Sequence, residues 1–185
     1  MSLSVFAELW GPAFIHAVWH VSVPVAARVS SMVFLGWLVG SPCQGWLLSR
    51  IGSIRKLFLW QSALAAVCIS LVIYSGTIPL WRIEVLLFLF GLFASVEVVC
   101  FTMAVEQVSK QMAATAVAFI NFFIMMSGLL FQPLVGHLLD KYWQGGMHHG
   151  MRVYTATNFQ SALFMLPLAM IAVFLLSWFI RREQA

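Results

Sequence analysis

Residues 83–104 decide the fold of this chain, and they read IEVLLFLFGLFASVEVVCFTMA. Glu84 and Glu97 are the only charged side chains in this stretch. A helix needs about 20 mostly apolar residues to cross the hydrocarbon core of a bilayer. The stretch is therefore predicted to form a transmembrane helix, and Glu97 then lies near the middle of the membrane.

Five other segments of the chain resemble this stretch in length and apolar content. The expected spans are, in chain order, 3–19, 25–48, 57–74, 83–104, 113–139 and 159–180. The first is the weakest candidate, because it is short and contains Glu8 and Pro12. Strands of an outer-membrane barrel would alternate over about ten residues, and these runs are about twice as long. The predicted fold class is an all-α membrane protein, a single domain formed by a bundle of six transmembrane helices.

The composition of the whole chain agrees with this prediction. Of the 185 residues, 62% are hydrophobic and only 9% are charged, and the mean hydropathy is +0.96. Such a chain has too little polar surface to cover a water-soluble globule. A soluble enzyme, a disordered tail and an ordinary nucleic-acid-binding domain are thereby excluded. The expected surroundings are the lipid bilayer, and nucleic acid is not an expected partner.

The basic residues predict how the chain is oriented in its membrane. Arg50, Arg55 and Lys56 lie together between the second and third spans. Lys110 and the arginine pair at 181–182 lie on the same side, which gives that side six basic residues against four on the other. Short loops rich in Lys and Arg stay in the cytoplasm. This side, and with it both termini, is expected to face the cytoplasm from an inner membrane.

Small residues spaced four apart predict where helices touch, because they let two backbones approach closely in lipid. The pattern occurs in the second, fourth and fifth spans. The pairs are Gly36 with Gly40, Gly91 with Ser95, and Ala114 with Ala118.

The loop between the second and third spans carries a motif, GWLLSRIGSIRK at residues 45–56. It resembles the loop signature of the major facilitator superfamily, roughly G-x-x-x-D-R-x-G-R-R-K, which follows the second helix of each six-helix half. Ser49 replaces the acidic residue of the signature, and Ser53 replaces its first arginine after the glycine. Ser49 therefore cannot form the ion pair of the family's charge network. The positions that match the signature are Gly45, Arg50, Gly52, Arg55 and Lys56.

A second stretch supports the same resemblance. Residues 116–121, AVAFIN, are followed by Ser-Gly at 127–128 and by QPLVG at 132–136, and this order is similar to that in the eleventh helix of such transporters. The resemblance implies the carboxy-terminal six helices of a facilitator, and it covers nearly the whole chain. It also implies secondary active transport of a small solute by alternating access. A complete facilitator has twelve helices and binds its substrate between two halves.

The expected partner is therefore a missing amino-terminal half, or a second copy of this chain, together with the transported solute. The alternative function is a non-transporting membrane scaffold or an inactive remnant. No Walker loop, catalytic triad or metalloprotease helix occurs in the sequence, so the chain is not predicted to be an enzyme. His16 and His20 share a helix face but lack a third ligand. No metal or cofactor is expected.

Three residues are candidates for the substrate or proton pathway. Glu97 lies in mid-span, where a charge costs roughly 2.5 to 3.5 kcal/mol and most often faces an interior or a water-filled path. Its alternative role is that of a protonated carboxyl bonded to a neighbouring helix. Asn121 and Gln132 are eleven residues apart, about three turns, and so share a face of the fifth span. Their alternative, which we favour for each alone, is ordinary hydrogen bonding between helices.

Overall fold

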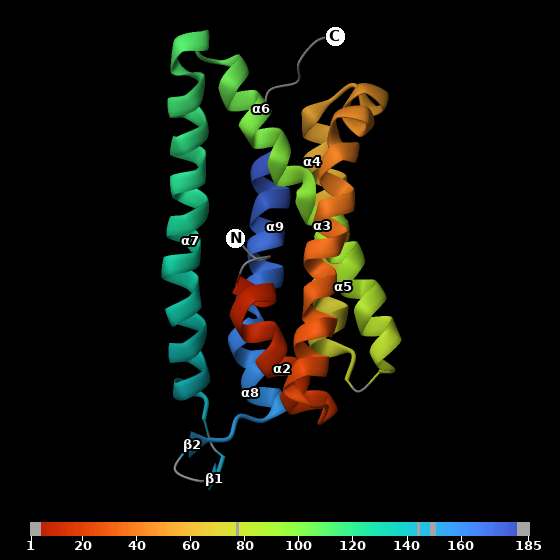
Figure 1. Cartoon of the computed structure of the whole chain (residues 1–185), viewed down its shortest axis with the longest axis vertical. Helices are drawn as coiled ribbons and strands as arrows, with labels where there is room; N and C mark the ends of the chain where they lie inside the picture. The colour runs from red at the N-terminus through yellow and green to blue at the C-terminus, as the bar shows by residue number, and fades with distance from the viewer. Residues whose placement is uncertain (1–4, 77, 144, 149–150, 181–185) are drawn as a thin grey trace.

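A computed structural model describes residues 5–76, 78–143, 145–148 and 151–180. The first residues of the first expected span, and the arginines at 181 and 182, lie outside this range. The described chain is almost entirely helical (Figure 1). Its long helical segments are α3 (Val23–Ile51), α4 (Ile54–Tyr74), α5 (Leu80–Ala94) with η2 (Ser95–Glu97) and α6 (Val98–Glu106), η3 (Lys110–Met112) with α7 (Ala113–Lys141), and α8 (Ala156–Leu163) with α9 (Met165–Ser177).

Within the described residues, five helical segments are long and apolar enough to cross a membrane. They contain the second to fifth expected spans entirely. The sixth span ends earlier than expected, at Ser177, because residues 178–180 form turns. The prediction of an all-helical fold with long apolar helices is thus confirmed for five of the six spans.

The first expected span, 3–19, is helical but short. It consists of the π-helix η1 (Val5–Trp10) followed by α2 (Gly11–Trp19). At the α-helical rise of 1.5 Å per residue, these residues extend at most about 22 Å, whereas the hydrocarbon core is about 30 Å thick. The described part of this segment therefore does not reach across a bilayer. Its buried side chains, including Phe6 and Phe14, instead belong to the core of the bundle.

The tightest helix contact is the crossing of α3 over α5. A β-carbon built on Gly36 would lie 1.9 Å from the carbonyl oxygen of Phe88, and one built on Gly91 would lie 1.9 Å from that of Val33. One turn further along, Gly40 packs in the same way against Ser95. The predicted contacts of both glycine-containing pairs are confirmed, because only glycine lets these backbones meet.

The third small-residue pair, Ala114 with Ala118, was predicted to form a similar contact, and no helix of the described chain packs against it. Both residues are exposed on α7. Small residues permit a close approach but do not cause one, and here no neighbouring helix has been brought against that face.

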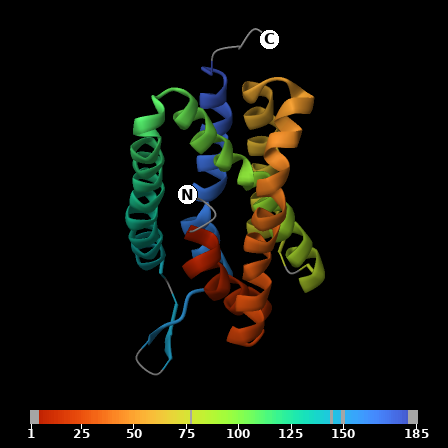
Figure 2. The same ribbon diagram turned by 45° about the horizontal axis from the view of Figure 1, so that its top comes forward.

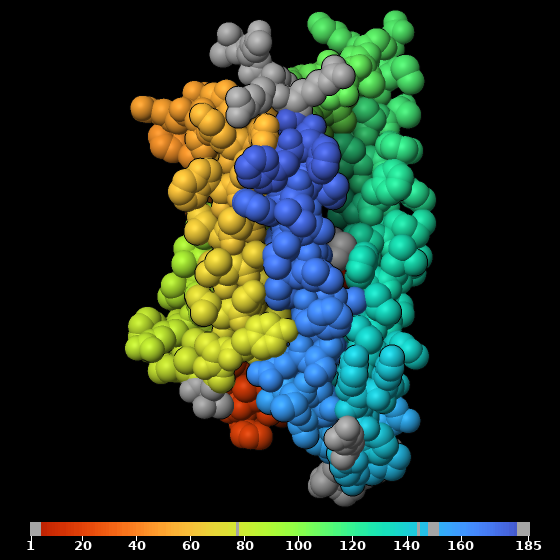
Figure 3. Space-filling model, turned by 180° about the vertical axis from the view of Figure 1, so that it is seen from behind, coloured from red at the N-terminus to blue at the C-terminus, as the bar shows by residue number. Residues whose placement is uncertain are grey.

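The helix α7 stands to one side of the others, and this is visible in both ribbon views (Figures 1 and 2). None of the 18 residues in the most apolar part of this span is buried. It is joined to the rest mainly by α6 at one end and by η1 and α8 at the other. Figure 3 shows the opposite face, where α8 and α9 run between α4 and α7. Most of the apolar surface of α7 is therefore available to lipid or to another polypeptide.

Local signals in the sequence explain where the helices begin and end. Gly52 ends α3 with a φ of +63°, and its N–H donates to the carbonyl oxygen of Leu48. Ser53 then caps α4 through its side chain. At the other end of the bundle, β1 (Met147–His148) and β2 (Met151–Arg152) form a short antiparallel hairpin before α8. Thr155 and Asn158 form a capping box that starts α8.

Candidate functional site

The centre of the fourth span is interrupted by the 3₁₀ turn η2, which ends at Glu97. The hydroxyl of Ser95 donates to the carbonyl oxygen of Leu92 at 2.7 Å. Serine side chains that bond back to the preceding turn compete with the helix and often bend it. A 3₁₀ stretch within a helix marks a hinge or a strained segment. The carboxyl of Glu97 is therefore placed where the span changes its helical form.

Two buried glutamine side chains bond to each other, and one of them bonds to this turn. Gln44 of α3 and Gln61 of α4 exchange two hydrogen bonds of 3.0 and 2.9 Å, and both residues are 4% exposed. The Nε2 of Gln44 also donates to the hydroxyl of Ser95 at 2.7 Å. Buried polar groups are costly unless they are paired. The three side chains satisfy one another and so tie three spans together beside the break.

Sequence analysis did not single out this amide pair. A signal was present, because Gln44 and Gln61 each lie in a run of apolar residues, where an amide needs a partner. The pairing itself depends on the helix crossing, which no local pattern reveals.

Glu97 lies between this buried polar cluster and an open cavity. Its Oε1 accepts a hydrogen bond of 3.1 Å from the indole N–H of Trp37 on α3. The residue is half-buried, and it also lines a cavity of about 330 Å³ between α6 and α7. Glu97 thus bonds to a neighbouring helix and also borders a cavity, so the geometry is compatible with either of the roles considered for it. The other lining residues are Cys100, Phe119, Ile120, Phe123, Ile124 and Ser127.

The structure does not bring the other two pathway candidates into this cavity. Asn121 is exposed on α7 and is not among the lining residues. Gln132 lies lower on α7 and donates to Glu8 at 3.4 Å, and its carbonyl oxygen accepts from Trp10 at 3.2 Å. Gln132 therefore joins α7 to η1, which is the helix-bonding role favoured from the sequence. Sequence analysis predicted none of the residues of α7 that line the cavity, which are Phe119, Ile120, Phe123, Ile124 and Ser127.

The loop motif lies at the end of the bundle opposite the hairpin, far along α3 from Trp37. Gly52 supplies the left-handed turn. The backbone N–H of Lys56 donates to the hydroxyl of Ser53 at 3.4 Å. Gly45 lies within α3 and has open space around it. The motif therefore builds a tight connection between α3 and α4.

The two arginines of the motif contact aromatic rings. The guanidinium carbon of Arg50 lies 5.5 Å from the centre of the Trp46 ring, and that of Arg55 lies 4.8 Å from the centre of the Trp178 ring. Cation–π contacts of this kind contribute roughly 0.5 to 1 kcal/mol at exposed sites. Arg55 thereby connects the motif to the last span.

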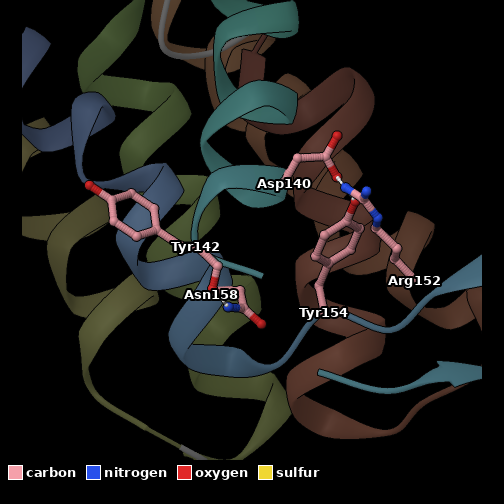
Figure 4. Close-up of polar contacts among 5 residues, drawn as sticks. All are labelled: Asp140, Tyr142, Arg152, Tyr154 and Asn158. Atoms are coloured by element: carbon pink, nitrogen blue, oxygen red, sulfur yellow. Dashed lines mark hydrogen bonds and ion pairs between the residues drawn. The ribbon is translucent and has the colours of Figure 1, made fainter. Parts of the chain in front are cut away.

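A polar cluster closes the other end of the bundle (Figure 4). Asp140, near the end of α7, accepts hydrogen bonds of 2.6 Å from both Arg152 and Tyr154. The bond to Asp140 raises the pKa of Tyr154 above its ordinary value. Asn158 of α8 donates to the backbone carbonyl of Tyr142 at 2.6 Å. The cluster fixes the hairpin and α8 to α7, and sequence analysis did not predict it.

The described residues hold no group of three or more His, Cys, Asp or Glu that could bind a metal ion. Over the part of the chain that the structure describes, the fold and the site define a helical protein with five helices long and apolar enough to cross a membrane and an acid near the middle of one of them. No protein-family model matches the chain, and no curated protein shows significant similarity to it. Any functional conclusion therefore depends on the geometry around Glu97.

Proposed function

We propose that this chain is part of a secondary transporter that moves a small solute across an inner membrane by alternating access, with Glu97 carrying a proton. The single observation that supports this most is the position of Glu97. Its carboxyl lies in mid-span, at a helix break, and borders a cavity of about 330 Å³. Acidic groups at this depth are expensive, and they commonly mark ion and proton paths.

Two features of the surroundings of Glu97 support this role. The indole N–H of Trp37 donates to the carboxyl and so fixes its position beside the cavity. The adjoining turn η2 supplies a place where the helix can change its form.

The exposed apolar face of α7 supports a proposed partner in the membrane. Such a face, next to a cavity, suits the second half of a transporter, either a separate amino-terminal half or a second copy of this chain. The resemblance of residues 45–56 to the facilitator loop supports the same assembly. The basic residues of that loop support an orientation with both termini in the cytoplasm. The solute would then lie between the two halves.

The proposal is tested in liposomes that contain the protein, with any subunit that co-purifies with it, and an enclosed pH-sensitive dye. A panel of small amines, carboxylates and sugars is added outside in turn. At least one solute should move protons in the wild type and not in Glu97→Gln, which retains an acceptor for Trp37. Glu106→Gln is the matched control, because Glu106 is exposed at the end of the same span, and it should behave like the wild type.

Two outcomes would contradict the proposal. One is that no solute class moves protons, which favours the membrane scaffold instead. The other is that Glu97→Gln retains the full flux, which removes this acid from the mechanism.

A further inference from the structure

Three basic residues lie together at the tight connection between α3 and α4. Arg50 lies in the last turn of α3, and Arg55 and Lys56 lie in the first turn of α4. These three residues form the loop cluster. The sequence contains no aspartate or glutamate between Glu8 and Glu84. The loop cluster is therefore a concentration of positive charge without an acid nearby along the chain.

The loop cluster has no counter-ion among the residues that the structure describes. Its three side chains form no hydrogen bond or ion pair with any of those residues. Toward the opposite end of the bundle, by contrast, Arg28 pairs with Glu84 at 3.2 Å, and Arg152 pairs with Asp140 at 2.6 Å. The charged donors of the loop cluster therefore remain available to an anionic ligand.

Exposed tryptophans indicate the depth at which the loop cluster lies. Trp46, Trp60 and Trp178 are 62%, 67% and 56% exposed. Arg50 lies over the ring of Trp46, and Arg55 lies over the ring of Trp178, which directly follows α9. Exposed tryptophan favours the boundary between hydrocarbon and water. The loop cluster is therefore expected at the level of the lipid headgroups, with Arg55 connecting the ends of α4 and α9.

An apolar groove of about 710 Å³ runs between these same two helices, which lie side by side in Figure 3. Three hydroxyl groups line it, and each already donates to a backbone carbonyl oxygen; they belong to Ser70, Tyr74 and Ser75. The groove therefore suits an apolar occupant. Its apolar lining includes Ala63, Ala66, Val67, Phe174 and Leu175.

The groove begins just below the loop cluster. Leu175 is three residues from Trp178 on α9, and Ala63 is eight residues from Arg55 on α4. At 1.5 Å per residue these separations are about 5 and 12 Å along the helices. The hydrocarbon core has a half-thickness of about 15 Å. A molecule with its charge at the loop cluster can therefore place an apolar chain in the groove within one leaflet.

We propose that the loop cluster and this groove bind one anionic phospholipid. The guanidinium groups of Arg50 and Arg55 donate to the phosphate oxygens, which they fit in a bidentate manner. Lys56 adds a third positive charge. One acyl chain lies in the groove between α4 and α9. This inference does not depend on the transport function proposed above.

The experiment uses the protein in a neutral detergent and counts bound lipids by native mass spectrometry. Each basic residue near an anionic lipid strengthens binding by about fivefold. The first phosphatidylglycerol should therefore bind at least about 25-fold more tightly than the first phosphatidylcholine, whose headgroup has no net charge. Glycerol 1-phosphate carries the anionic phosphate without acyl chains, and at equal concentration it should not displace the lipid.

Charge variants locate the headgroup. The double variant Arg50→Gln with Arg55→Gln should weaken phosphatidylglycerol binding by about 25-fold. The matched control is Arg82→Gln with Lys141→Gln, which also removes two basic groups that lie over aromatic rings, at the other end of the bundle. It should bind within about twofold of the wild type, because an acid lies close to each of these positions in the sequence.

Two single variants complete the test. The side chain of Lys56 is exposed, so Lys56→Gln should leave the fold intact and weaken binding by about fivefold. Ala66→Leu fills the groove and should also weaken binding. Ala118→Leu is its control, because Ala118 is exposed on α7 and does not line the groove.

The outcomes that would overturn the inference differ from one another. Equal affinity for the two lipids, or an equal loss in the two double variants, would mean attraction to overall charge and not to this site. Displacement by glycerol 1-phosphate would indicate a soluble phosphate as the ligand. Unchanged binding in Ala66→Leu would exclude the acyl chain from the groove.

Discussion

The contact between α3 and α5 makes a quantitative prediction for Gly91→Ala. The added β-carbon would lie 1.9 Å from the carbonyl oxygen of Val33, whereas ordinary contact begins at 3.4 Å. The helices must therefore separate by about 1.5 Å, the difference of these two values, because a backbone oxygen cannot rotate away as a side chain can. Overpacking of this kind costs about 1 to 3 kcal/mol. The higher helix propensity of alanine offsets up to about 1 kcal/mol of this cost.

The expected net loss is about 1 to 2 kcal/mol in the free energy of unfolding. It is measured in mixed micelles by titration with a denaturing detergent, with circular dichroism as the signal. Gly128→Ala is the control, because a β-carbon there meets no atom within 4 Å. That variant should be neutral or slightly more stable than the wild type. A Gly91→Ala protein within about 0.5 kcal/mol of the wild type would refute the argument that this crossing requires glycine.

Three further predictions concern other parts of the bundle. Asp140→Asn should lower the pKa of Tyr154 toward its ordinary value near 10, read from phenolate absorbance; an unchanged titration would contradict the bond between them. The pKa of Tyr154 is higher in the folded protein than in the unfolded chain. The contribution of this contact to the free energy of unfolding is therefore complete below about pH 10, and it is lost as the pH rises through the pKa of Tyr154 in the folded protein. Gln44→Leu should cost about 1 to 3 kcal/mol by orphaning Gln61, and the double variant with Gln61→Leu should recover part of this loss in the same unfolding titration. Thr155→Ala should cost about 0.5 to 2 kcal/mol by removing the cap of α8, whereas Thr157→Ala, two residues further along, should cost less because the side chain of Thr157 is not the cap.

Much of the fold was accessible from the sequence. Transfer of a helix into lipid depends on the length and composition of that helix alone, so hydropathy locates it without knowledge of its neighbours. The glycine spacing in the second and fourth spans also predicted a real contact. The span at 3–19 was the exception, because apolar composition there reflects burial inside the bundle, by residues such as Phe6 and Phe14, and not the length needed to cross.

The candidate site was accessible only in part. Glu97 stands out in the sequence because an acid in an apolar run has a high energetic cost. Asn121 has the same appearance of a polar residue in a span, yet it lies outside the cavity. The rings of Phe119 and Phe123 give no signal, since phenylalanine is an ordinary component of a lipid-facing helix.

By itself the sequence determined that this chain is helical, that its helices are long and apolar, and that one of them carries an acid at its centre. Only the tertiary structure decided that Glu97 meets Trp37, that two glutamines share hydrogen bonds beside it, and that α7 stands apart and leaves a cavity. The physical reason is that span formation is a local property of composition. The meeting of side chains depends instead on how helices cross and rotate, and this is set by packing between residues far apart in the chain.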